Sequence, residues 1–186
     1  WASWSVSAAY SGNEIAPKAT ILQAGELFTK EAYDSTNIHF NNVLLLTAKW
    51  DEFNMFRDYS KQTVNDSIIQ NEITSEFLGI ALGTGKWNTT YGDFENGSAR
   101  RRELILTNHR LLTHNKKAIG TTIDWLDETI GINTTLDNAN QVFAIKEVLV
   151  LVATFSAIVS MFALFMILIK IPFFTSIAHP EIILER

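Results

Sequence analysis

The chain has 186 residues, a formal net charge of -5 at pH 7 and no cysteine. Its length suits one soluble domain with a short membrane segment. An acidic chain offers no basic surface for a nucleic acid, and a chain without cysteine has no disulfide, thiolate metal site or cysteine nucleophile. Because it begins at Trp1 and carries no targeting signature at either end, we expect an excerpt of a longer protein.

Several apolar runs predict the elements of a soluble domain. Residues 1–11 are rich in alanine and aromatic side chains and are followed by a glycine, which predicts a helix. Two continuous apolar runs at residues 18–24 and 42–48 are typical of strands buried on both faces, and therefore of a parallel sheet. A third, weaker run at residues 103–107 predicts another strand.

Helical patterns separate these strands. Residues 56–82 carry apolar side chains at helical spacing, and residues 116–130 repeat them three and four positions apart. The glycine-containing stretch at residues 83–102 predicts a loop with little regular structure. Strands that alternate with helices indicate an α/β fold with crossover connections.

A long apolar stretch at residues 148–169 contains neither a charge nor a proline. At about 1.5 Å per residue it matches a hydrocarbon core roughly 30 Å thick, and its side chains favour insertion. Lys146 and Glu147 precede the stretch, and Lys170 and Pro172 follow it. We therefore predict a transmembrane helix and a membrane localisation, with the soluble domain on the extracytoplasmic side.

Two residues with catalytic chemistry follow predicted strands. Asp51 stands just past the 42–48 run, and His109 just past the 103–107 run. The carboxyl ends of parallel strands meet at one sheet edge, where such sheets place ligands and catalytic groups. An aspartate that accepts the imidazole N–H fixes the tautomer that a serine nucleophile needs from its base. We predict that Asp51 and His109 converge within hydrogen-bond range as catalytic acid and base.

These residues resemble the α/β-hydrolase superfamily. The sequence NVLLLTAKWDEF at 42–53 is similar to the family's acid strand and loop, and ELILTNH at 103–109 is similar to its histidine loop. Residues 1–10 look like the helix that follows the G-x-S-x-G elbow. The resemblance implies that the nucleophilic serine and the oxyanion-hole amides lie before Trp1.

The resemblance also implies a division of the chain and a function. The predicted parts are a partial α/β-hydrolase domain at residues 1–132, a linker at 133–147, a transmembrane helix at 148–170 and a post-membrane segment at 171–186. The implied protein is a membrane-anchored serine hydrolase that cleaves an ester or amide bond of a small molecule or peptide by acyl transfer. No cofactor or metal is implied. Relatives with a C-terminal membrane domain imply further spans, and this fragment alone is expected to be inactive.

Simpler interpretations of the same residues stay open. Aspartate favours turns, so Asp51 can be a surface acid at a strand end, with Glu52 as a second candidate for the catalytic acid. His109 can be a solvated loop histidine, and His114 is a weaker candidate base. The chain also offers possible nucleophiles near its start, Ser3, Ser5 and Ser7. None of them has the flanking glycines of a nucleophile elbow, which argues against each as the nucleophile.

Other functional classes also fit. A membrane-anchored binding or sensory domain with a degenerate hydrolase fold has the same sequence features, because a fold does not determine a function. A transporter subunit predicts several spans with polar groups inside the membrane. The sequons at Asn65, Asn88, Asn96 and Asn133 are consistent with an exported domain and with chance.

Overall fold

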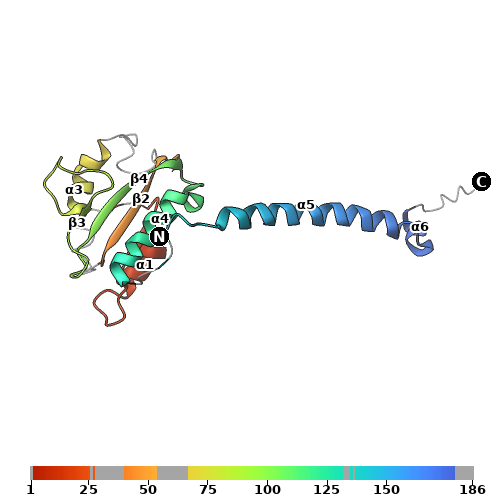
Figure 1. Ribbon diagram of the computed structural model, residues 1–186, viewed down its shortest axis with the longest axis horizontal. Coiled ribbons are helices and arrows are strands. Elements are labelled where there is room, and N and C mark those ends of the chain that lie inside the picture. Colours follow the sequence, from red (N-terminus) through yellow and green to blue (C-terminus); the bar gives the residue numbers. More distant parts are fainter. Residues whose placement is uncertain are drawn as a thin grey trace, which may run out of the picture. The chain divides into compact units, whose positions relative to one another are not determined.

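The computed structural model describes residues 2–25, 27, 40–53, 67–131, 135 and 137–178. The chain divides into two compact units, Trp1–Asn140 and Gln141–Arg186. The first unit contains the helices α1 (Ala2–Ala9), α3 (Glu72–Leu78) and α4 (Lys116–Ile130), the 3-10 turns η3 (Ile68–Gln70) and η4 (Leu112–His114), and the strands β1 (Thr20–Gln23), β2 (Val43–Trp50), β3 (Thr90–Tyr91) and β4 (Arg100–Asn108) (Figure 1). The second unit contains α5 (Phe143–Leu168) and α6 (Pro172–Ala178).

The described strands form a four-stranded sheet in the order β1-β2-β4-β3. The strands β1, β2 and β4 are parallel, whereas β3 pairs antiparallel with β4. The predicted strands are therefore confirmed as parallel neighbours, but the sheet as a whole is mixed. The prediction of little regular structure at residues 83–102 is wrong in part, because β3 lies there and β4 already begins at Arg100.

Three consecutive arginines gave the start of β4 the sequence pattern of a solvated loop, yet the fold provides partners for them. Arg100 donates to three main-chain oxygens, the nearest being that of Phe40 at 2.6 Å. Arg102 is only 2% exposed, and its guanidinium donates to the hydroxyls of Thr47 and Thr74. Partners from distant segments therefore allow a charged sequence to form a buried strand.

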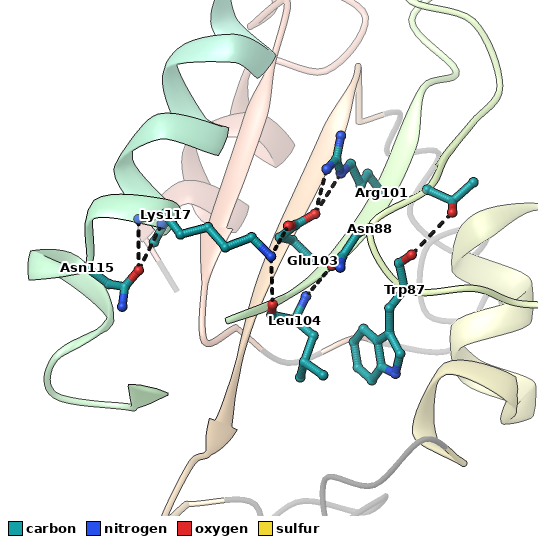
Figure 2. Close-up of polar contacts among 9 residues, drawn as sticks. Trp87, Asn88, Arg101, Glu103, Leu104, Asn115 and Lys117 are labelled. Carbon is teal, nitrogen blue, oxygen red and sulfur yellow. Dashed lines mark hydrogen bonds and ion pairs between the residues drawn. The ribbon is translucent and has the colours of Figure 1, made fainter. Parts of the chain in front are cut away.

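The remaining arginine, Arg101, takes part in an ionic contact around the buried Glu103 side chain, which joins β4 to α4 (Figure 2). The Glu103 side chain is 1% exposed, with Arg101 Nη2 2.7 Å from one carboxylate oxygen and Lys117 Nζ 2.9 Å from the other. Lys117 extends from the first turn of α4 and also lies 3.4 Å from the main-chain oxygen of Leu104. Because a buried charge is costly unless it is paired, the two cations allow an acidic residue at this position.

The side chains of β2 alternate between two apolar clusters, one on each face of the sheet. On one face, Leu44 and Leu46 pack in a cluster that includes Ala118 and Trp125 of α4. On the other face the cluster contains Leu22, Leu27, Val43 and Leu45, against which Phe40, Ile73 and Phe77 pack. Burial on both faces explains why this strand is a continuous apolar run rather than an alternating one.

Local capping signals set the ends of the helices. Asn115 accepts hydrogen bonds from the amides of Lys117 and Ala118, and α4 ends at Gly131 in the left-handed region with φ 67°. The helix predicted at residues 116–130 is therefore confirmed. The Trp125 indole donates to the main-chain oxygen of Asn42 at 3.0 Å, which ties α4 to the start of β2.

Residues 56–66 of the helix predicted at 56–82 lie outside the described part, and residues 67–82 contain η3 and α3 rather than one continuous helix. Asn71 has an extended backbone, and its side chain accepts from the Thr74 amide at 2.8 Å. The helix α3 therefore begins after Asn71 and ends at Gly79, whose φ is 68°. An N-cap residue inside the apolar pattern separates η3 from α3.

The second unit is dominated by α5, the one helix among the described residues that is long and apolar enough to cross a membrane. Its 26 residues are all outside the core and span roughly 39 Å at the usual helical rise. The helix begins at Phe143, so part of the predicted linker is helical. Thr154 and Ser156 donate to the main-chain oxygens of Val150 and Val152, which satisfies both hydroxyls within the helix.

Candidate functional site

The candidate site lies past the carboxyl ends of β2 and β4. Trp50 is the last residue of β2 and is paired with Asn108, the last residue of β4. The residue that follows β2 is therefore Asp51, and the residue that follows β4 is His109. The predicted strand ends are neighbours in the sheet, which the sequence could suggest but could not determine.

A register shift brings these two strand ends level. Ala48 is paired with Ile105, so an undisturbed ladder would pair Trp50 with Thr107. The observed partner of Trp50 is Asn108, because β4 contains one residue more than β2 between the two pairs. This irregularity is local, and no feature of the sequence indicated it.

The two side chains are in contact. Nδ1 of His109 lies 3.2 Å from each carboxylate oxygen of Asp51. The Asp51 side chain is 1% exposed, whereas the His109 side chain is 34% exposed. A buried carboxylate therefore faces an imidazole that is partly open to solvent. The contact requires a proton on Nδ1 of the neutral ring, because a carboxylate only accepts hydrogen bonds.

The tautomer set by Asp51 determines the chemistry of the other ring nitrogen, Nε2. Within the ranges given above, Nδ1 is the ring atom of His109 that makes hydrogen bonds, and none involves Nε2. A neutral imidazole with a proton on Nδ1 has a lone pair on Nε2. A carboxylate therefore sets the tautomer of an imidazole whose side chain is 34% exposed, and this tautomer makes Nε2 a proton acceptor.

The loop after β2 also contacts His109 at two further points. The carboxylate of Glu52 accepts from the main-chain N–H of His109 at 3.3 Å. The Phe53 ring lies edge-on to the imidazole, with centroids 4.8 Å apart and an interplanar angle of 71°. Asp51 Oδ1 also accepts from the Phe53 amide at 2.9 Å, which orients the carboxylate within its own loop. Sequence reasoning missed the contacts of Glu52 and Phe53.

Comparisons of the chain with protein-family models, with curated proteins and with solved structures found no match. The α/β-hydrolase resemblance is therefore a prediction from the residues alone. The contact between Asp51 and His109 does not depend on that resemblance, because it follows from the register of two adjacent strands.

The weaker candidates lie elsewhere in the first unit. Ser7 is buried, and its hydroxyl is 2.7 Å from that of Thr20, so it has a structural contact between α1 and β1. Ser3 and Ser5 are exposed on α1, and His114 is the last residue of η4. Among the described residues, no group of three or more histidine and acidic side chains could hold a metal ion.

Two of the four sequons fall within the described residues. Both asparagines are exposed. The side-chain oxygen of Asn88 accepts from the Leu104 amide at 2.9 Å, and that of Asn96 accepts from the Ser98 amide at 2.9 Å. Asn65 and Asn133 lie outside the described residues.

Proposed function

We propose that this chain is the C-terminal part of a membrane-anchored serine hydrolase, with His109 as the general base and Asp51 as the acid that orients it. The observation that supports the proposal is the buried Asp51 carboxylate on Nδ1 of a partly exposed imidazole whose Nε2 makes no hydrogen bond with the described residues. This arrangement suits the activation of a hydroxyl nucleophile.

The reaction follows from the proton positions. A serine hydroxyl within about 3 Å of Nε2 transfers its proton to His109 while its oxygen attacks the substrate carbonyl carbon. The imidazolium then returns the proton to the leaving alcohol or amine, and an acyl-enzyme forms. A water molecule repeats the sequence, releasing the carboxylic acid and restoring the serine.

Asp51 contributes through charge and orientation. Its carboxylate is almost completely buried, so its interaction with a developing imidazolium is less screened than at a surface. The hydrogen bond also holds the ring with Nε2 directed away from the carboxylate. Loss of such an acid lowers kcat by about 10⁴-fold in enzymes of this mechanism.

The remaining parts of the machinery are proposed to lie in sequence before Trp1, as the resemblance implies. These parts are the serine and the main-chain amides that stabilise the oxyanion. The substrate class is an ester or amide of a small molecule or a peptide. We further propose that α5 anchors the hydrolase domain to a bilayer, with that domain on the extracytoplasmic side.

The test uses the full product of the gene that contains these residues, reconstituted in lipid nanodiscs. We expect a fluorophosphonate probe to label one serine, and His109→Ala to abolish the labelling. His114→Ala is the matched control, because this histidine also lies after β4 but makes no contact with Asp51, and it should label normally.

Two results would count against the proposal. One is a full-length protein that no fluorophosphonate labels, which would favour a membrane-anchored binding or sensory domain. The other is labelling that survives in His109→Ala at the wild-type rate. The 186-residue chain alone, which lacks the proposed serine, is expected to remain unlabelled.

A further inference from the structure

Three consecutive residues of the loop after β2 each hold a different part of His109. Asp51 binds the ring nitrogen Nδ1, Glu52 accepts from the main-chain amide, and Phe53 packs edge-on against the ring. The contacts thus engage a ring atom, the backbone and a ring surface. A side chain held at both its backbone and its tip has fewer orientations than one held at its tip alone.

The Glu52 contact lies where the sheet no longer holds the two loops together. The last pair of the β2 and β4 ladder is Trp50 with Asn108. One residue further on, the hydrogen bond from the His109 amide to Glu52 joins the two strands at their ends. Because a side chain rather than the backbone provides the acceptor, a single substitution can remove this bond and leave the ladder intact.

We propose that Glu52 is a positioning residue for the imidazole. By accepting the His109 amide hydrogen, its carboxylate fixes the backbone from which the imidazole extends toward Asp51. The consequence for catalysis rests on the proposed function. The structural part of the proposal concerns the position of one ring and holds for any role of this site.

The exposure of Glu52 indicates how it acts. Glu52 is exposed, and its contact with the amide is long for a charge-assisted hydrogen bond, at 3.3 Å. Solvent screens the charge of an exposed carboxylate, so its electrostatic effect on the ring is small. The position of the acceptor oxygen is therefore what fixes the His109 backbone. An uncharged side chain of the same shape should fix it equally well.

The test compares Glu52→Ala with Glu52→Gln in the full chain, labelled with ¹⁵N and reconstituted in lipid nanodiscs. We expect Glu52→Ala to raise the amide hydrogen exchange rate of His109 about five- to tenfold, the effect of losing one hydrogen bond. We also expect weaker nuclear Overhauser effects between the His109 and Phe53 rings. Glu52→Gln keeps an acceptor oxygen and should stay within about twofold of the wild-type exchange rate.

Control measurements separate positioning from damage to the fold. Glu14→Ala removes an exposed glutamate from the loop after α1 and should leave the His109 signals unchanged. The exchange rates of the buried residues Leu45 and Ile105 should be the same in all variants, because they report on the sheet.

The proposal is overturned if Glu52→Ala leaves both the exchange of the His109 amide and the ring contacts at wild-type values. It is also overturned if Glu52→Gln behaves like Glu52→Ala, because the charge and not the acceptor position would then be responsible. Neither measurement depends on hydrolysis. A full-length protein without a reactive serine would remove the proposed function and leave this result intact.

Discussion

Trp50 and Asn108 are partners at the ends of β2 and β4, so the residues that follow them meet beyond the sheet. This pairing places the Asp51 carboxylate 3.2 Å from Nδ1 of His109. The contact requires both the adjacency of two strands that are far apart in sequence and the extra residue in β4.

Asp51→Asn should change the tautomer of His109. The asparagine can turn its NH₂ group toward Nδ1, which stabilises a ring with the proton on Nε2 instead. The ¹⁵N signals of the imidazole in the neutral ring distinguish the two tautomers directly. Asp137→Asn is the control, since that exposed residue accepts from the Ala139 amide, which asparagine can also do. A neutral His109 ring with its proton on Nε2 in wild type would contradict the assigned contact, because a carboxylate cannot donate to a bare Nδ1.

Glu103→Gln should destabilise the first unit by about 2 kcal/mol. The substitution leaves Arg101 and Lys117 facing a neutral amide in place of the Glu103 carboxylate, whose side chain is 1% exposed. Lys117→Met should cost less than about 1 kcal/mol, because the lysine is 54% exposed. Urea unfolding of the full chain in detergent, followed by tryptophan fluorescence, measures both. An equal loss of unfolding free energy in Glu103→Gln and Lys117→Met would contradict the larger contribution of the buried glutamate.

Trp125→Phe should cost about 1–2 kcal/mol and Trp125→Ala about 3–5 kcal/mol. Phenylalanine keeps most of the buried ring but loses the hydrogen bond to the Asn42 oxygen, whereas alanine also leaves a cavity between α4 and the sheet. The urea midpoint provides the free energies. The half-buried Phe94 packs edge-on to Trp125, and Phe94→Leu should cost less than Trp125→Ala. A smaller loss for Trp125→Ala than for Phe94→Leu would contradict the packing.

Two arginines in the middle of α5 should prevent membrane insertion. The helix has no charged residue between Val148 and Leu168. Phe155→Arg with Val159→Arg adds roughly 6 kcal/mol on the insertion scale, which offsets most of the gain from the apolar side chains. Extraction of membranes with alkaline carbonate should release the double variant and retain wild type. The control carries leucine at both positions and should be retained, and its release would contradict a spanning role for α5.

The sequence alone determined the elements whose signals are local. The buried run at residues 42–48 shows its strand through continuous apolar side chains, and α4 shows its helix through apolar residues repeated three and four positions apart. The long apolar stretch likewise gives α5, because the length of a span depends only on consecutive residues. Asp51 and His109 are predicted as catalytic acid and base because each lies just past the end of a predicted strand.

The tertiary structure alone decided which strands are neighbours and where charges can be buried. Arg102 and Glu103 lie in a buried strand because Thr47, Thr74 and Lys117 reach them from other segments, and such partners leave no mark in a local pattern. The one-residue shift between β2 and β4, and the contacts of Glu52 and Phe53 with His109, depend in the same way on segments more than fifty residues apart. Side-chain periodicity reports which face a residue occupies, whereas the register between strands is set by the packing of the whole sheet.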